Sequence, residues 1–341
     1  MHPALYSVAA PGGQVLCRLC PHDCVIAPGR SGLCGVRQNR EGVLYSLNYG
    51  KAIALHVDPI EKKPLYHVYP GSRCFSIAAA GCNFRCRFCQ NHEISQIRPG
   101  QDVWGGREVT ARLVIEQAVA GGCRTLACTY TEPTVYYEYA LEICRLAHAQ
   151  GIDTIWVTNG FIHEPPLREI APCLTAANVD LKGWNEDFYH SVVGGALAPV
   201  LDTLRLLKKL GIWLEVTTLA VPGYSDDEES LHAIALFIKD ELGPETPWHI
   251  SRFYPQYRMI DLPPTPLEVL HKARRIGLEA GLRYVYTGNA PGDIGENTYC
   301  YRCGVLLIER SGYTISANYL ESGCCPQCRT KLDGLFSKEA V

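Results

Sequence analysis

The chain has 341 residues, of which 47% are apolar and 20% charged, and its formal net charge is −3. This composition is that of an ordinary soluble globular protein, and the charge argues against broad affinity for nucleic acid, although a local basic patch is left open. There is no run of about 18 apolar residues and no signal-peptide pattern at the N-terminus. We therefore expect a cytoplasmic protein with no membrane partner.

Residues 1–72 are rich in Pro, Gly and Cys and show little periodicity, which predicts an irregular, Cys-rich N-terminal extension. Four of the 17 cysteines of the chain fall here, at Cys17, Cys20, Cys24 and Cys34. Disulfides are rare in a reducing cytosol, so grouped cysteines indicate a metal. Four ligands suit a closed site that holds either zinc or a second [4Fe–4S] cluster, and the spacing does not decide between them.

Residues 73–289 alternate short β-rich runs with longer helical patterns. Strands are predicted at 74–80, 124–130, 153–159, 176–181, 213–221, 248–254 and 283–288. This alternation indicates parallel βαβ units and an α/β fold. We predict a partial (β/α) barrel; a doubly wound sheet is the competing architecture.

Helices are predicted between these strands at 110–122, 134–151, 225–243 and 265–281. Ser225 and Glu228 have the spacing of a capping box, and Thr265 and Glu268 repeat it with a proline at the first helical position.

Three cysteines follow the first predicted strand directly, as Cys82, Cys86 and Cys89. A cubane iron–sulfur cluster takes four thiolates, so three leave one iron without a protein ligand. An open coordination position is typical of a catalytic metal site. Active sites of (β/α) barrels lie at the carboxyl ends of the strands, where these cysteines are predicted.

Residues 290–341 form a third region, with a C-x2-C pair at Cys300 and Cys303 and another at Cys325 and Cys328. This spacing is typical of a zinc ribbon or rubredoxin-like module with one tetrahedral metal site, and zinc is the metal we expect. Cys324 is a spare cysteine beside the second pair.

The C-x3-C-x2-C motif with Phe88 before its last cysteine resembles the signature of the radical S-adenosylmethionine (SAM) superfamily. Five segments, at 17–39, 56–72, 81–91, 130–134 and 249–257, together resemble the radical SAM enzyme of the AmmeMemoRadiSam system. That family is similar to pyruvate formate-lyase activating enzymes. The resemblance covers nearly the whole chain, and "DPIEKKPLYH" is its most specific part.

The resemblance implies a [4Fe–4S] cluster on Cys82, Cys86 and Cys89, with SAM on the fourth iron. Reductive cleavage of SAM would give a 5′-deoxyadenosyl radical that abstracts hydrogen from a substrate. The segment "TYTEPT" looks like the family's Gly-Gly-Glu-Pro position, which places Glu132 on the SAM ammonium, although Tyr130 and Thr131 replace the two glycines. Further contacts with SAM or substrate are expected from Phe88, Thr158, Asn159, Asp180, Lys182, His249 and Arg252.

Two substrate classes follow from the resemblance. One is a small molecule, protein side chain or RNA base, modified together with AMMECR-type and Memo-type partner proteins. The other is a glycyl-radical enzyme, suggested by the Asp-Leu-Lys segment at 180–182. A reductant such as flavodoxin or ferredoxin is expected in either case. A remote alternative is a non-catalytic zinc-binding interaction protein.

The stretch 56–67, "HVDPIEKKPLYH", contains two histidines, two acids and two lysines. It is expected either to cover the SAM site or contact substrate, or to be a solvated loop that packs the extension onto the barrel.

Overall fold

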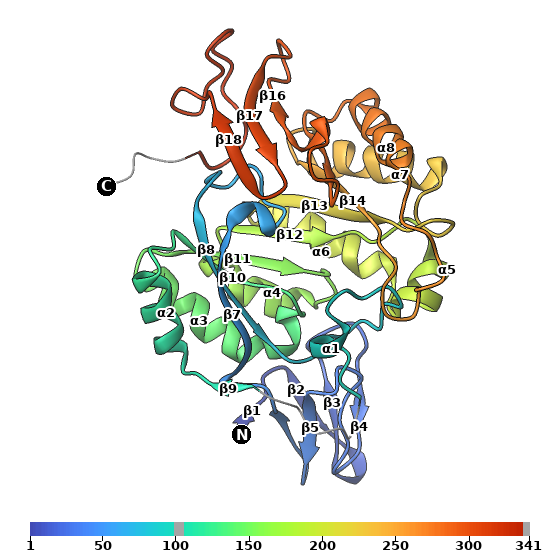
Figure 1. Cartoon of the computed structure of the whole chain (residues 1–341). Helices are drawn as coiled ribbons and strands as arrows, with labels where there is room; N and C mark the ends of the chain where they lie inside the picture. The colour runs from blue at the N-terminus through green and yellow to red at the C-terminus, as the bar shows by residue number, and fades with distance from the viewer. Residues whose placement is uncertain (99–105, 337–341) are drawn as a thin grey trace.

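The computed structural model describes residues 1–98 and 106–336, and its centre is a nine-stranded sheet (Figure 1). Seven strands run parallel in chain order: β8 (Arg73–Ala79), β10 (Thr125–Cys128), β11 (Asp153–Thr158), β12 (Ala176–Asp180), β13 (Trp213–Ala220), β14 (Trp248–Arg252) and β15 (Val285–Gly288). All seven coincide with predicted strands. The sheet order is linear from β15 to the opposite edge, so the predicted partial barrel of mixed α/β class is confirmed.

Two strands extend the sheet beyond β8. Strand β7 (Lys51–Pro59) pairs antiparallel with β8, and β9 (Arg107–Glu108) pairs antiparallel with β7. Neither was predicted from the sequence. Strand β7 comes from the Cys-rich N-terminal region, so that region contributes directly to the central sheet.

Helices connect consecutive parallel strands and cover one face of the sheet. They are α1 (His92–Ser95), α2 (Ala111–Ala120), α3 (Tyr137–Ala149), α4 (Glu164–Ile170), α5 (Glu186–Phe188), α6 (Leu197–Lys209), α7 (Glu228–Phe237) and α8 (Leu267–Ala280). Shorter helical turns are η1 (Pro11–Gly13), η2 (Ile60–Lys62), η3 (Pro133–Tyr136), η4 (Ala171–Cys173), η5 (Tyr189–Val193), η6 (Ile238–Leu242) and η7 (Ile294–Glu296). No described helix has the length and apolar character that crossing a membrane requires.

Strand side chains alternate between two cores, because successive residues point to opposite faces. Phe75, Ile77 and Trp156 belong to the large core between the sheet and the helices. Their neighbours Cys74 and Ile155 belong to a smaller core on the concave face. Residues of the 60–68 segment complete that smaller core, so this segment closes the inside of the barrel.

The capping predictions for α7 and α8 were wrong. The N-cap of α7 is Asp227, which accepts from the Ser230 N–H at 2.8 Å. Ser225 instead donates its hydroxyl to the Leu219 carbonyl at 2.8 Å. Thr265 donates to the Ala220 carbonyl at 2.6 Å and leaves α8 without a side-chain cap. Both hydroxyls are buried and bond to the carboxyl end of β13, so tertiary contacts replaced the local caps.

The N-terminal region forms two small sheets below the barrel, β2 (Ser7–Ala10), β3 (Gln14–Cys17) and β4 (Val25–Ile26), and β1 (His2–Pro3), β6 (Val43–Ser46) and β5 (Arg37–Arg40). A buried ion pair anchors them to α3, with Arg37 Nη1 3.0 Å from Glu138 Oε1. The same carboxylate oxygen accepts the Leu5 N–H at 2.8 Å.

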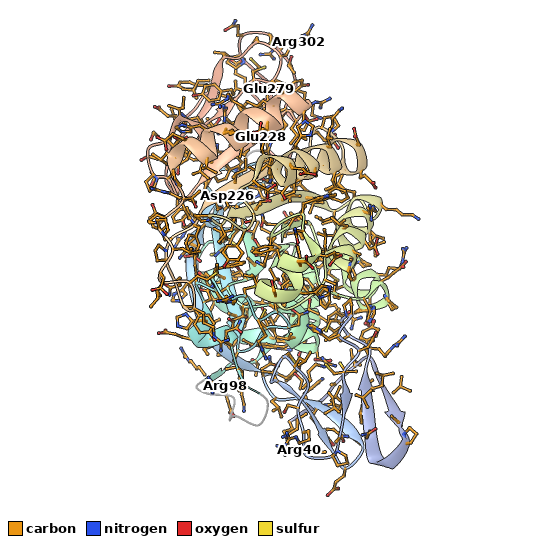
Figure 2. The ribbon with its side chains drawn as sticks, turned by 90° about the vertical axis from the view of Figure 1, so that its right-hand side faces the viewer. Arg40, Arg98, Asp226, Glu228, Glu279 and Arg302 are labelled. Carbon is orange, nitrogen blue, oxygen red and sulfur yellow. The ribbon has the colours of Figure 1, made fainter. Side chains whose placement is uncertain are left out.

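The C-terminal region forms a sheet of β16 (Thr298–Tyr299), β17 (Leu306–Ser311) and β18 (Thr314–Asn318) with a small core of its own. Buried Arg310 fastens it to the barrel: its Nη2 donates to the Tyr66 carbonyl at 3.1 Å, and its guanidinium lies 4.2 Å from the centre of the Tyr66 ring. Figure 2 shows the two terminal regions at opposite ends of the molecule, marked by Arg40 and Arg302.

The stretch 56–67 is not a solvated loop. Glu61 is 1% exposed, and Lys63 and His67 are 0% exposed. Lys63 Nζ lies 2.7 Å from Asp58 Oδ2, and His67 Nε2 lies 2.7 Å from the Tyr286 hydroxyl. Lys63 and His67 therefore have hydrogen-bonding partners inside the barrel.

Candidate active site

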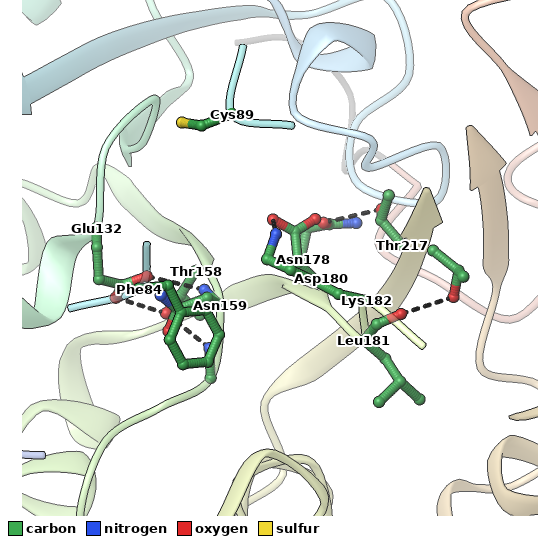
Figure 3. Close-up of polar contacts among 12 residues, drawn as sticks. Phe84, Cys89, Glu132, Thr158, Asn159, Asn178, Asp180, Leu181, Lys182 and Thr217 are labelled. Atoms are coloured by element: carbon green, nitrogen blue, oxygen red, sulfur yellow. Dashed lines mark hydrogen bonds and ion pairs between the residues drawn. The ribbon is translucent and has the colours of Figure 1, made fainter. Parts of the chain in front are cut away.

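A cavity of about 480 Å³ opens at the carboxyl ends of the parallel strands. Cys82, Cys86 and Cys89 line it. Six further residues predicted for the site line it too: Phe88, Glu132, Thr158, Asn159, Asp180 and Lys182. Figure 3 shows two groups of bonded side chains below Cys89, one around Glu132 and one around Asp180 and Thr217.

The cysteine loop begins at Gly81, whose φ of 107° favours glycine. A Cβ there would lie 2.8 Å from Val36 Cγ1. Two N–H groups point at the Cys82 sulfur, from the Phe84 backbone at 3.3 Å and from Asn159 Nδ2 at 3.7 Å. Burial raises the pKa of Cys82 well above its ordinary value and that of Cys86 to about 12. A thiolate at these positions therefore needs a metal or a nearby cation to stabilise it.

Glu132 joins the ends of two neighbouring strands. Its Oε1 accepts from the Thr134 and Thr158 hydroxyls, both at 2.7 Å, and from the Thr134 N–H at 3.0 Å. Its Oε2 accepts from the Asn159 N–H at 2.8 Å. Burial raises the pKa of Glu132, and these bonds oppose the rise. The carboxylate thus fixes the loops after β10 and β11, and Oε2 carries fewer bonds than Oε1.

Tyr130 stands where the resembled family has a glycine, and it keeps a glycine-like conformation with a φ of 65°. Its hydroxyl donates to Asp58, and its carbonyl accepts from Asn91 Nδ2 at 2.7 Å. Burial alone would raise the pKa of Asp58. Its hydrogen bonds, of which the one from Lys63 has the largest effect, outweigh burial and lower this pKa. These bonds hold the unusual backbone in place without a glycine.

Lys182 supplies a buried cation beside the cysteines. Its Nζ lies 2.9 Å from Asp180 Oδ2 and 5.9 Å from the centre of the Phe88 ring. Burial alone would lower the pKa of Lys182, but the charges of Asp180 and Cys86 outweigh it and raise the pKa above its ordinary value. Lys182 is therefore an ammonium at neutral pH and offsets negative charge on the cysteine loop.

His249 and Arg252 lie apart from the cysteines. His249 Nε2 is 2.6 Å from Glu215 Oε2, and its ring lines a second cavity of about 420 Å³. Arg252 Nε donates to the Thr265 carbonyl at 2.7 Å, and Arg252 lines neither this cavity nor the first. The alternation of side chains along a strand explains why His249 lines the second cavity and Arg252 does not. Residues 249 and 251 share the concave face, whereas 252 faces outward.

Sequence reasoning missed several residues that line the first cavity. Gln90 directly follows the last cysteine of the motif, and Ser251 shares the face of His249, so both positions had a local signal. Lys62 and Tyr313 line it as well, from η2 and from the turn between β17 and β18. No βα pattern marks those two segments, and only the tertiary fold brings them to the site.

The two cavities adjoin, because Lys62, Gln90, Ser251, Asn289 and Tyr313 line both. Glu61 also lines the second cavity, where its Oε2 is buried without a hydrogen-bond partner among the described residues. Burial raises the pKa of Glu61. The second cavity therefore offers an unsatisfied carboxyl oxygen to a ligand with a hydrogen-bond donor.

The family model of the radical SAM superfamily matches residues 76–234. This range includes the three cysteines and the groups around Glu132 and Lys182, the residues that line the first cavity in the structure. The chain belongs to the radical SAM superfamily. It is therefore an enzyme of that superfamily, and the superfamily implies SAM and a [4Fe–4S] cluster as cofactors.

Sequence similarity between this radical SAM enzyme and its relatives extends over the whole chain in one case and over half of it in another. An uncharacterized protein of Methanocaldococcus jannaschii is 46% identical over 337 residues, which are 98% of this chain and 99% of the relative. The pyruvate formate-lyase 1-activating enzyme of Escherichia coli is 28% identical over 181 residues, 50% of this chain and 70% of that enzyme. The crystal structure of a radical SAM methyltransferase from Sphaerobacter thermophilus has a TM-score of 0.52 at 17% identity, covering 67% of this chain and 71% of that one, and supports the fold.

The cavity of this radical SAM enzyme fits the implied cluster. One loop presents three thiols to a single space of about 480 Å³, N–H donors point at the Cys82 sulfur, and Lys182 supplies positive charge. These features suit a negatively charged cluster with three thiolate ligands, because buried charge requires compensation.

The four C-terminal cysteines of the enzyme are grouped closely enough to bind one metal ion. The sulfurs of Cys300, Cys303, Cys325 and Cys328 all lie within 4.8 Å of one another. Two of the separations are 3.6 Å. A tetrahedral zinc with bonds of about 2.3 Å separates its thiolates by about 3.8 Å. The site therefore suits a single tetrahedral metal ion, and Cys324 is not part of it.

Proposed function

We propose that this enzyme cleaves SAM reductively in the first cavity, and that the resulting 5′-deoxyadenosyl radical abstracts hydrogen from a substrate. The observation that carries the proposal is the meeting of Cys82, Cys86 and Cys89 with a buried carboxylate and a buried ammonium in one cavity at the strand ends. The reduced cluster supplies the electron that breaks a carbon–sulfur bond of SAM.

The residues around the cluster have separate tasks in this proposal. The three cysteines would hold the cluster through three thiolates, which would leave one coordination position open for SAM. Glu132 Oε2 accepts from the SAM ammonium, because Oε1 already accepts three bonds. Asn159 acts as a positioning residue, since its Nδ2 donates to Asn83 Oδ1 at 2.8 Å and its Oδ1 accepts the Phe161 N–H at 2.9 Å.

The cavity also protects a reactive radical. Buried Phe84 and Phe88 line it together with Val157 and Leu219. An apolar wall keeps water away from the reacting atoms and limits side reactions.

Activity is tested by anaerobic reconstitution with iron and sulfide, reduction, incubation with SAM and measurement of 5′-deoxyadenosine. We expect product from the wild type and none from Cys86→Ala. Cys173→Ala is the matched control, because Cys173 is half-buried and far in sequence from the motif; it should keep its activity. Absence of 5′-deoxyadenosine from wild type with a full cluster would contradict the proposal.

For the substrate we propose a small molecule or a single side chain or base that occupies the second cavity. Its volume of about 420 Å³ lies within the range of small-molecule sites, about 300–1,000 Å³. Activation of a glycyl-radical enzyme is the second candidate, and the similarity to the Escherichia coli pyruvate formate-lyase 1-activating enzyme favours it. A glycyl radical on an added partner, detected by electron paramagnetic resonance, would support the second candidate against the first.

We also propose a cytoplasmic location, AMMECR-type and Memo-type partners, and flavodoxin or ferredoxin as the reductant. The support is the resemblance of the segments at 17–39 and 56–72 to the AmmeMemoRadiSam family. Adding the purified partner proteins should raise the rate of 5′-deoxyadenosine formation above the rate of the enzyme alone. An unchanged rate with both partners would argue against a shared reaction.

A further inference from the structure

The four N-terminal cysteines surround one small cavity below the active site. Cys17, Cys20, Cys24 and Cys34 all line it. Cys17 and Cys34 are buried, and the other two are half-buried. We infer that these four thiols hold a second [4Fe–4S] cluster, with every iron bound by the protein.

The sulfurs of these four cysteines are not drawn together as those of the C-terminal site are. A single tetrahedral ion draws four thiolates to within about 3.8 Å of one another. Among the described residues, only the C-terminal cysteines group within 4.8 Å. A cubane holds its thiolates farther apart, because each thiolate binds a different iron. Among the described residues, the radical SAM cysteines likewise form no group within 4.8 Å, and their site is the one that the superfamily assigns to a [4Fe–4S] cluster.

A buried cation without a full set of partners faces the same space. Arg37 lines the cavity and is 2% exposed. Its Nη1 donates to Glu138, but its Nε has no hydrogen-bond partner in the part of the chain that the structure describes. Such an unpaired buried donor is rare and costly unless a ligand satisfies it. The sulfides and thiolates of a cluster are acceptors that would satisfy it and would carry the matching negative charge.

The site lies directly against the loop that holds the first cluster. His22 Nε2 lies 2.7 Å from the Asn83 carbonyl, and Arg85 donates to the Leu33 carbonyl. A Cβ at Gly81 would lie 3.3 Å from the Cys34 carbonyl oxygen. Asn83 itself lines the cavity of the four cysteines. The second cluster would therefore be close enough to the first for their spins to interact.

The test is a metal count after anaerobic reconstitution with iron, sulfide and zinc all offered. We expect about eight irons and about one zinc per wild-type chain, since each cubane has four irons. Cys20→Ser should keep about four irons, and Cys86→Ser should also keep about four, now in the N-terminal site. Cys173→Ser, the matched control, should keep the wild-type count.

About four irons and two zincs in wild type, or a Cys86→Ser variant without iron, would overturn the inference. If Cys20→Ser does not fold, Cys86→Ser decides alone, because the N-terminal site is untouched in it. The reduced wild type should also show about two spins per chain with mutual broadening, which Cys86→Ser should abolish. The inference does not depend on SAM chemistry: eight irons without 5′-deoxyadenosine would uphold it and refute the proposed function.

Discussion

Replacement of Asn159 by alanine should lower the reduction potential of the radical SAM cluster. The Asn159 amide donates to the Cys82 sulfur at 3.7 Å. A hydrogen bond to a thiolate ligand stabilises the more negative, reduced state of a cluster and so raises its potential. Asn159→Ala removes this donor without touching a ligand.

The magnitude follows from the strength of one weak hydrogen bond. Such a bond is worth about 0.5–1.5 kcal/mol net. The potential responds to the difference in bond strength between the two redox states, and for a one-electron couple about 1.4 kcal/mol corresponds to 59 mV, so the potential should fall by no more than about 60 mV. The variant should also be less stable, because the Phe161 N–H and Asn83 Oδ1 lose their partner. Each unsatisfied buried group costs about 1–3 kcal/mol.

The assay is a redox titration of the cluster followed by electron paramagnetic resonance. Asn178→Ala is the matched control: Asn178 is buried on the neighbouring strand, with its Nδ2 on the Pro64 carbonyl and its Oδ1 accepting from Thr217. It should lose stability in the same way and keep its potential. Equal shifts in both variants, or a rise in Asn159→Ala, would refute the argument.

Three further predictions concern other parts of the molecule. In the enzyme prepared without metals, Glu138→Gln leaves Arg37 buried without its carboxylate partner and should lower the free energy of unfolding by about 3–5 kcal/mol, measured by chemical denaturation; a loss below 1 kcal/mol would show that the pair is not strongly coupled. Burial opposes ionised Glu215, but the bond to His249 outweighs this effect and lowers the pKa of Glu215. Ionised Glu215 therefore stabilises the folded protein above pH 4.5, its ordinary pKa, and this stabilisation is lost as the pH falls through the lowered pKa. The melting temperature of Glu215→Gln should therefore lie below wild type at pH 7 and converge with it in acid; a constant difference would contradict this sign. Cobalt(II) bound at the C-terminal cysteines should give the absorption of a tetrahedral thiolate site, and Cys303→Ser should weaken it; unchanged absorption would exclude this site as its source.

The alternating strands and helices of the barrel could be predicted from the sequence. Seven parallel strands and their helices follow from the alternation of β-rich and helical runs, and parallel topology then puts the residues after β8, β10, β11 and β12 at one edge. Cys82, Glu132, Asn159 and Lys182 were therefore predictable as neighbours.

The rest depends on contacts between distant parts of the chain. The sequence left open whether the stretch with Lys63 and His67 covers the SAM site or is a solvated loop, because charged residues are usually exposed. The His67 partners Tyr286 and Asp333 lie more than 200 positions away. Ser225 and Thr265 have capping-box spacing, but the carboxyl end of β13 takes both hydroxyls. Local patterns carry no information on such distant partners.

The turn between β17 and β18 makes the C-terminal region a wall of the reaction chamber. Tyr313 lines both cavities, and Gly312 lines the second. A metal bound by Cys300 and its three partners would therefore stabilise the segment that supplies this wall. Without that metal, Tyr313 would lose the support of the C-terminal core, and both cavities would become more open on this side.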